Sequence, residues 1–305
     1  MVKREGMRTG PILAGACVLL IGICMLFMAG CQKQQDAENT KDPDALAQLG
    51  TILVAAREEG SGTRTVFAKK AGLLPRTESE KPDRTRKDAC TANSTKEVIT
   101  YVNSNQAAIG YASVGTENET GEVKTIKVDG VKADTENIKK DKYPLSRPFL
   151  LAYTGELDEL ETDFFDYVMG KGQKIVQKSY VAVEKESTFL SNNASGVITI
   201  HGSTSMEELI NQLAEEYMTI NPNAKIEVTA SDSTSGLSDA MQGRCDLGMA
   251  SRELKDYEQE LMKYKVIAKD GIAIVVNPKN PLENITTKQL QKIYTGKIQE
   301  WKELQ

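Results

Sequence analysis

Short apolar runs rich in β-branched residues alternate with stretches of helical periodicity along most of this 305-residue chain. Such alternation is typical of α/β proteins. Helical spacing predicts helices at 160–179 and 205–219, and Thr286 or Thr287 is expected to cap a shorter helix through Ile293. The runs predicted to be strands are 51–55, 108–111, 123–128, 149–153, 197–201, 225–229, 247–250 and 272–276.

Residues 1–30 have the features of an export signal, which does not belong to the fold. Three basic residues precede a mostly apolar stretch, 11–28, and small residues then lead to Cys31. This ending resembles the lipobox of bacterial lipoproteins, in which the cysteine thiol is diacylated and becomes the new N-terminus. The alternative is an uncleaved transmembrane anchor, since about 18 apolar residues can just span a bilayer. Both predict that the rest of the chain lies outside the cytoplasm.

Residues 31–49 are polar and lack apolar periodicity, so we expect a tether between the anchor and the folded body. About 255 residues remain, enough for one large domain or two lobes. The formal net charge is −5, and it becomes about −7 without residues 1–30, which carry three basic side chains and one acidic one. Such an acidic body is a poor candidate for binding nucleic acid or an anionic membrane surface.

Cysteine and histidine usage argues against a metal site and a catalytic triad. Outside the signal and Cys31, only Cys90 and Cys245 remain, and two isolated cysteines fit no zinc pattern or disulfide framework. They could pair in an oxidising compartment, although Cys245 lies in an apolar run where a small buried thiol is expected. His201 is the only histidine, so a triad or a histidine metal site would depend on this residue alone. We therefore predict no metal and no cofactor.

Three strand-to-helix junctions share glycines and small hydroxyl residues: 57–64 (REEGSGTR), 202–205 (GSTS) and 231–236 (SDSTSG). The first turn of a helix presents unpaired backbone N–H groups and partial positive charge, so it can bind an anion. Hydroxyl groups add donors, and glycine allows close approach to the backbone. Each junction alone could be an ordinary N-cap. Three that converge, with Arg57 and Arg252 nearby, would surround a small tetrahedral oxyanion.

Enzymatic patterns are missing from these junctions. The nucleotide phosphate loop GxxxxGK[ST] is absent, and no lysine follows the glycines. The nucleophile-elbow pattern GxSxG is not met either, and no second histidine-type base is available to activate Ser61. The sequence therefore predicts a binding protein and not an enzyme.

Six segments cover nearly all of the expected folded body: ITIHGSTSMEELINQLAEEY (198–217), CDLGMASREL (245–254), GIAIVVNPKNPLENITTKQLQKIYTGKIQEWKEL (271–304), REEGSGTRTVF (57–67), NSTKEVITYVNSNQAAIGYASVG (93–115) and KYPLSRPFLL (142–151). Through these segments the chain resembles the phosphate-binding proteins of phosphate ABC importers, which are members of the class II periplasmic-binding-protein superfamily. This resemblance implies an α/β fold of two lobes, joined by two crossing strands that act as a hinge, with the anion held between the lobes.

The resemblance also implies roles for single residues. Arg57 should grip the phosphate, oriented by Glu59. Backbone and hydroxyl donors at a helix start should come from 61–63, and others from 204–205 in the opposite lobe. The complete implied set is Arg57, Ser61, Gly62, Thr63, Thr204, Ser205, Ser233, Thr234 and Arg252.

One departure from the family concerns selectivity. Many members place an aspartate directly after a G-A-S run, where its carboxylate accepts the proton of hydrogen phosphate and so rejects sulfate. Here the run 248–252 is GMASR, and Arg252 can only donate. The residue that accepts the proton is therefore left open, and with it the strictness of phosphate selection.

A second departure concerns the order of the segments. In the family the GSTS segment comes first and REEGSGTR follows the WKEL segment, whereas here REEGSGTR comes first and the chain ends at WKELQ. This order indicates a circular permutation in which the polar segment 183–196 joins the old termini. One lobe would then comprise 50–114 with 275–305, and the other 115–274. The alternative is a truncated fragment of a tandem duplication.

The resemblance implies an extracytoplasmic, membrane-anchored lipoprotein that captures inorganic phosphate and delivers it to the permease subunits of an ABC importer. Two other functions remain open. One is a phosphate sensor or structural lipoprotein without a transport partner. The other is an enzyme acting on a phosphorylated substrate, for which the sequence shows no general base.

Overall fold

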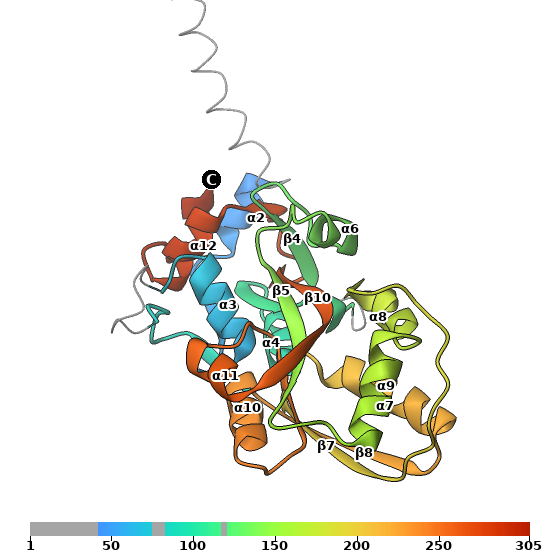
Figure 1. The fold of residues 1–305 in the computed structure, drawn as a ribbon. Coiled ribbons are helices and arrows are strands. Elements are labelled where there is room, and N and C mark those ends of the chain that lie inside the picture. The colour runs from blue at the N-terminus through green and yellow to red at the C-terminus, as the bar shows by residue number, and fades with distance from the viewer. Residues whose placement is uncertain (1–41, 75–82, 117–120) are drawn as a thin grey trace, which may run out of the picture.

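The computed structural model describes residues 42–74, 83–116 and 121–305 (Figure 1). The export signal, the lipidation candidate Cys31 and residues 31–41 of the expected tether lie outside these residues. The remainder of the expected tether is helical: α2 (Pro43–Gln48) begins after Asp42, whose carboxylate accepts a hydrogen bond from the Ala45 N–H, and it buries Leu46. Among the described helices, none combines the length and apolar character needed to cross a bilayer.

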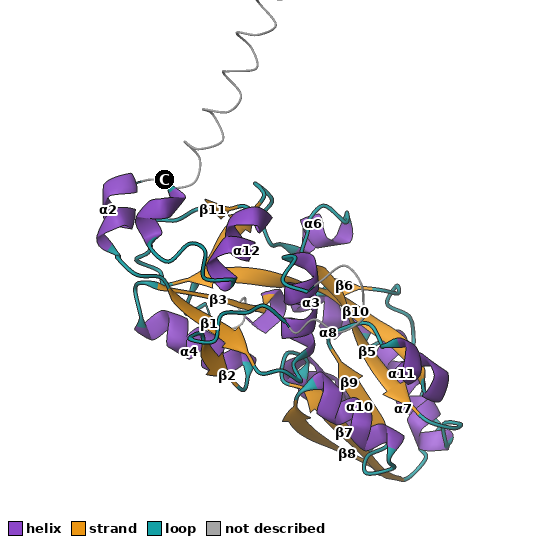
Figure 2. Cartoon of the chain, turned by 90° about the vertical axis from the view of Figure 1, so that its left-hand side faces the viewer, coloured by secondary structure: helices purple, strands orange, loops and turns teal. Residues whose placement is uncertain are grey.

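One mixed sheet runs through both lobes (Figures 1 and 2). Three further strands pair beside its main path: β4 (Lys124–Val128) and β6 (Val181–Ala182) pair with β10, and β11 (Asn284–Ile285) pairs with β4. The main path, in spatial order, is β2 (Cys90–Ala92), β1 (Leu53–Arg57), β3 (Ala108–Ser113), β10 (Lys263–Val276), β5 (Ser146–Tyr153), β9 (Leu247–Ala250), β7 (Gly196–Ser203) and β8 (Ala224–Ser231).

Strand β10 connects the two lobes. Its C-terminal part pairs antiparallel with β3, from Ile272 opposite Ser113 onward, while its N-terminal part, 263–271, pairs antiparallel with β5. β5 crosses beside it, so two antiparallel strands form the connection, as the predicted fold requires (Figure 2). The sequence predicted only 272–276 as a strand, because charged residues interrupt the apolar pattern of 263–271.

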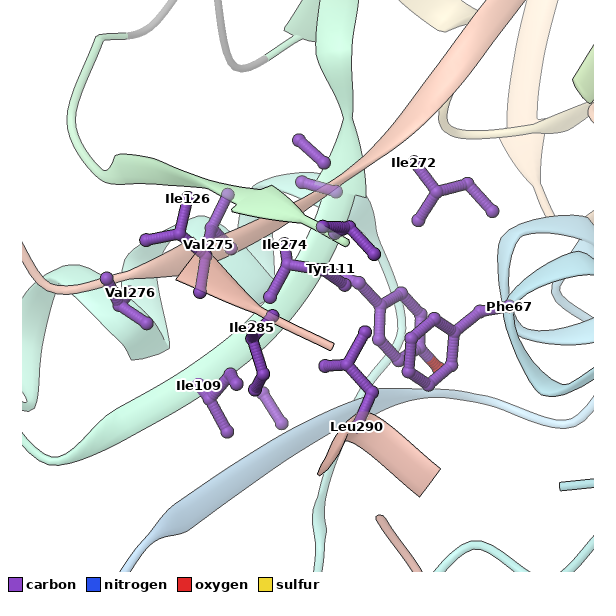
Figure 3. Packing of buried hydrophobic residues seen from close by; sticks show 14 of the residues in the cluster. Phe67, Ile109, Tyr111, Ile126, Ile272, Ile274, Val275, Val276, Ile285 and Leu290 are labelled. Atoms are coloured by element: carbon purple, nitrogen blue, oxygen red, sulfur yellow. The ribbon is translucent and has the colours of Figure 1, made fainter. Parts of the chain in front are cut away.

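Two large apolar clusters form the cores of the lobes, and a third, smaller cluster lies beneath α10. In the first, the rings of Phe67 and Tyr111 stack with centroids 4.2 Å apart, close to Leu290 (Figure 3). The sequence assigns 123–145 to the other lobe, but the buried side chains of this segment belong to the first cluster. Burial of these apolar surfaces is the main force that holds each lobe together.

Helices pack on the sheet in both lobes (Figure 1). The predicted helix 160–179 is two helices, because Gly170 leaves the helical region at φ −108° and ψ −103°. Thr286 caps α12 as predicted, through a reciprocal pair of hydrogen bonds with Gln289. The described helices of the first lobe include α2, α3 (Gly62–Lys70), α4 (Thr95–Ser104), α6 (Thr135–Lys139), α12 (Thr287–Tyr294) and the 3₁₀ helix η1 (Trp301–Leu304). Those of the second lobe are α7 (Glu159–Met169), α8 (Gln173–Ser179), α9 (Glu207–Ile220), α10 (Ser233–Met241) and α11 (Asp256–Leu261).

The two ends of the described chain lie together in the first lobe (Figure 1). The Ile52 N–H donates to the Gln299 carbonyl at 2.8 Å, and the Trp301 N–H donates to the Gly50 carbonyl at 2.9 Å. Residues 183–195 form neither helix nor strand, which agrees with the predicted surface connection. Cys90 and Cys245 are both free thiols in this structure.

Candidate anion-binding site

The first predicted junction is a turn between β1, which ends at Arg57, and α3, which begins at Gly62. Ser61 is the N-cap of α3, and its hydroxyl accepts a hydrogen bond from the Arg64 N–H. A Cβ added at Gly62 would lie 2.4 Å from the Oγ of Ser233 and 2.7 Å from the Oγ of Ser251. Only glycine therefore lets the start of α3 approach these two hydroxyls.

The other two junctions lie in the second lobe, and their hydroxyl groups converge with Ser251, which directly follows β9. Ser203 donates to the Oγ of Ser251 at 2.9 Å, and the Oγ of Ser233 lies 3.4 Å from the same atom. Ser205 is buried beside them, and its N–H donates to the Oγ of Ser203. We call Thr63, Thr95, Ser203, Ser205, Ser233 and Ser251 the hydroxyl cluster.

Both lobes contribute to the hydroxyl cluster, and direct hydrogen bonds join them there. The Oγ of Ser205 lies 2.9 Å from the Oγ1 of Thr63 and 3.0 Å from that of Thr95. Beside the cluster, Thr234 donates its hydroxyl proton to the Gly60 carbonyl at 3.0 Å. The structure thus shows the lobes closed over the residues that the sequence proposed as ligands.

Arg57 is almost completely buried, with 2% of its surface exposed. Its Nε and Nη2 donate to the two carboxylate oxygens of Glu58 at 2.8 and 2.6 Å, and its Nη1 donates to Thr95 at 3.2 Å. The prediction that Glu59 orients Arg57 is therefore wrong: Glu59 is exposed, and its neighbour Glu58 makes the ion pair. The sequence could not choose between two adjacent carboxylates.

Arg252 is also buried, and its guanidinium group pairs with both carboxylate oxygens of Glu258, at 2.6 and 2.8 Å. Burial alone would raise the pKa of Glu258, but hydrogen bonds from Arg252 and the Lys255 N–H lower it below the usual value. Arg252 contacts one other predicted ligand, Thr234: its Nη2 donates to the Oγ1 of that residue at 3.4 Å. It is therefore placed at the rim of the site, next to the contact between lobes.

Arg147 is a third buried arginine, and it is not among the ligands that the sequence predicts. From β5 its Nη1 donates to the Oγ1 of Thr63 at 2.6 Å, and its Nε donates to Asp270 on β10 at 2.9 Å. Its segment KYPLSRP was recognised, but nothing in the spacing showed that β5 would deliver this side chain to the site. Thr95 and Ser251 were missed in the same way, although each lies within a recognised segment. Ser203 belongs to the predicted junction 202–205 but not to the implied ligand set.

Three comparisons with known proteins agree with this architecture. A model of the PBP superfamily domain matches residues 23–171 and 187–305. The phosphate-binding protein PstS 2 of Streptococcus agalactiae is 37% identical over 298 residues, which cover 96% of this chain and 97% of that protein. The phosphate-binding protein PstS of Bacillus subtilis is 38% identical over only 114 residues, 36% of this chain and 38% of that protein.

A crystal structure from Streptococcus pneumoniae provides the structural comparison. It is a phosphate-binding protein of a phosphate ABC transporter, 37% identical in sequence, and it superposes with a TM-score of 0.69. The match covers 84% of this chain and 100% of that one. Both lobes of the fold described above therefore have a counterpart in a solved relative.

Proposed function

This chain belongs to the PBP superfamily, among its phosphate-binding proteins, and on that premise we propose that it captures inorganic phosphate between its lobes and delivers it to an ABC importer. The observation that carries the proposal is the hydroxyl cluster, which both lobes build around the N-terminus of α3. Neutral donors, a helix N-terminus and buried guanidinium groups are the chemistry that a phosphate dianion requires.

The nine predicted ligands have separable roles in this proposal. Arg57 supplies a cation that Glu58 orients. The N–H groups of Gly62 and Thr63 and the hydroxyl of Ser61 donate from the start of α3, whereas the Ser61 N–H donates to the Glu58 carbonyl. From the opposite lobe, 204–205 and Ser233 supply hydroxyl and backbone donors. Thr234 and Arg252 stand at the rim, where the lobes touch. Because the phosphate would contact both lobes, its binding should favour the closed state.

The localisation and the partners form a second part of the proposal. We place the body outside the cytoplasm, anchored through a lipid on Cys31, with the permease subunits of the importer as its partner. The support is the export-signal pattern of residues 1–30 and the phosphate ABC transporter named for the S. pneumoniae relative. The relatives are binding proteins, and His201, the single histidine, pairs with Asp239 of α10 at 2.9 Å. The role of the relatives favours binding over catalysis.

We also propose that the order of segments is a circular permutation. The short match to the B. subtilis protein, against the nearly full-length match to the S. agalactiae protein, supports a rearranged order between two groups of relatives. The contacts between 50–52 and 299–301 support it too, because they join the two ends of the described chain within one lobe.

A thermal-shift experiment tests phosphate binding. The chain from residue 32 onward should gain thermal stability in millimolar phosphate, and much less in sulfate, because a ligand that binds only the folded state stabilises it. Arg57→Ala should abolish the gain. Arg244→Ala, which removes a partly exposed arginine that pairs with Asp239, is the matched control and should keep it. An unchanged melting temperature of the unmutated chain in phosphate would refute the proposed function.

A further inference from the structure

Three buried polar atoms near the hydroxyl cluster lack a hydrogen-bond partner among the described residues: the Oγ1 of Thr204, the Nη2 of Arg147 and the Oδ1 of Asp270. Leaving such an atom unsatisfied costs roughly 1–3 kcal/mol. Two of these groups can donate a hydrogen bond, and the third, a carboxylate oxygen, can only accept one while it is ionised. A ligand that satisfies all three must therefore offer acceptors and one proton.

Arg147 and Asp270 form a completely buried ion pair in the connection between the lobes. They lie opposite each other in the register of β5 and β10, with side chains 0% and 1% exposed. The Nε of Arg147 donates to the Oδ2 of Asp270 at 2.9 Å, and Ser113 donates to the same oxygen at 3.0 Å. Nη2 lies 2.8 Å from Oδ2 but does not donate to it with hydrogen-bond geometry. The hydrogen bonds from Arg147 and Ser113 thus converge on Oδ2, and Oδ1 has no hydrogen-bond partner among the described residues.

The guanidinium group of Arg147 reaches from this pair to the hydroxyl cluster. Its Nη1 donates to Thr63 of the first lobe at 2.6 Å and lies 3.4 Å from the carbonyl oxygen of Ser251 of the second. Thr63 stands at the start of α3, where the proposed function places the anion. Asp270 therefore holds the edge that carries Nε and Nη2, while the end that carries Nη1 lies against the proposed phosphate position.

The other two buried arginines are paired differently. Glu58 uses both of its oxygens on Arg57, and Glu258 uses both of its oxygens on Arg252. Asp270 uses only one on Arg147. Burial raises the pKa of Asp270 above its usual value even though Arg147 and Ser113 oppose this shift, so its carboxylate is a stronger proton acceptor than an exposed one.

We propose that Arg147 and Asp270 determine the specificity of the phosphate site. The Nη2 of Arg147 and the hydroxyl of Thr204 donate to phosphate oxygens, and the Oδ1 of Asp270 accepts the P–OH proton of hydrogen phosphate. Sulfate and monofluorophosphate are dianions of similar size without that proton, so they would set a bare oxygen or fluorine against the carboxylate. Asp270 thereby supplies the acceptor that the arginine at position 252 cannot. The inference rests on the proposed function of the same site.

Calorimetry with four anions tests the inference. The unmutated chain should bind phosphate and arsenate, which both carry a proton, about 100-fold or more tighter than sulfate and monofluorophosphate. In Asp270→Asn the amide can donate to an unprotonated oxygen, so the preference for phosphate over sulfate should shrink by about tenfold or more. A folded Asp270→Asn protein with an undiminished preference would overturn the inference.

Two controls keep the result interpretable. Asp163→Asn changes another buried aspartate, which accepts hydrogen bonds from Ser191 and Tyr217 within the second lobe, and it should leave the anion preference unchanged. If Asp270→Asn does not fold, the double variant Arg147→Gln/Asp270→Asn removes both charges of the pair, and its preference decides the question by the same criterion.

The unmutated chain alone also provides a decisive measurement. Equal affinity for phosphate and monofluorophosphate would overturn the inference whatever the variants do. Failure of the chain to bind phosphate at all would instead refute the proposed function, so the two failures are distinguishable.

Discussion

Arg57 is followed in the sequence by two glutamates, yet only Glu58 folds back onto its guanidinium group. Strand β1 ends at Arg57, and the turn that follows leaves Glu59 in solvent. A fork of two charge-assisted hydrogen bonds fixes the plane of a guanidinium group as well as its position. Glu58 should therefore act on the anion indirectly, by holding Arg57 in its binding orientation.

Glu58→Gln should weaken phosphate binding about tenfold, because the amide can accept from only one side of the fork and loses the ionic contribution. Calorimetric titration with phosphate measures this effect. Glu59→Gln is the matched change one residue away, and it should leave the affinity within about twofold of the unmutated chain. A Glu58→Gln protein that binds phosphate as tightly as the Glu59→Gln protein would show that Glu58 does not hold Arg57 in its binding orientation.

Among the elements, α11 depends most visibly on a single buried carboxylate. Glu258 accepts hydrogen bonds from both Nη atoms of Arg252, which follows β9, and from the Lys255 N–H at the start of its own helix. This short helix of six residues has little stability of its own. The ion pair therefore fixes both α11 and the arginine that contacts Thr234 between the lobes.

The folded-state pKa of Glu258 is lowered, so its contribution to stability is fully present above the unfolded pKa of about 4.3. It is lost as the pH falls from there through the lower folded pKa. Glu258→Gln should cost about 3 kcal/mol at pH 7, because Arg252 is left buried without its partner.

Urea denaturation between pH 3 and pH 7 measures this contribution. At the acidic end of this range, the free energy of unfolding of Glu258→Gln should change less with pH than that of the unmutated chain. Glu260→Gln, an exposed change on the same helix, should reproduce the unmutated curve. If the free energy of unfolding of Glu258→Gln falls with acidic pH as steeply as that of the unmutated chain, the ion pair does not contribute to the pH dependence.

At the scale of the whole molecule, one continuous sheet couples the site to the connection between lobes. β10 pairs with β3 and β4 of the first lobe and with β5 and β6 of the second. Arg147 and Asp270 sit on the two crossing strands themselves. An anion held by this pair would therefore contact the two strands about which the lobes must move.

The permuted order can be tested by reversing it. We expect a chain that begins at Ser187, passes through Gln305 and a flexible linker to Asp42, and ends at Glu186 to fold and to bind phosphate within a few-fold of the original affinity. Both new ends are exposed, and the joined ends already lie together. Circular dichroism and calorimetry check the two expectations. A control cut inside buried β9 should not fold, and failure of both chains alike would contradict the proposed permutation.

Local signals in the sequence determined the elements and much of the site. The apolar runs predicted eight of the strands within a few residues at most ends, except that β10 was expected to be much shorter, and Thr286 was correctly expected to begin α12. The three hydroxyl-rich junctions were found because N-caps, glycines and small donors are encoded within four to eight neighbouring residues. The resemblance of six segments to a known family then predicted the two-lobed fold.

Only the tertiary structure decided which charged groups meet. Arg147 and Asp270 are far apart in the chain, and their pairing depends on the register of β5 against β10. The polar half of β10 was missed because its strand conformation is imposed by pairing with β5 along its length and with β6 at 268–269, and not by its own residues. The choice of Glu58 over Glu59 likewise depends on where β1 ends. Sequence fixes chemistry over a few residues, whereas the convergence of distant side chains depends on long-range packing.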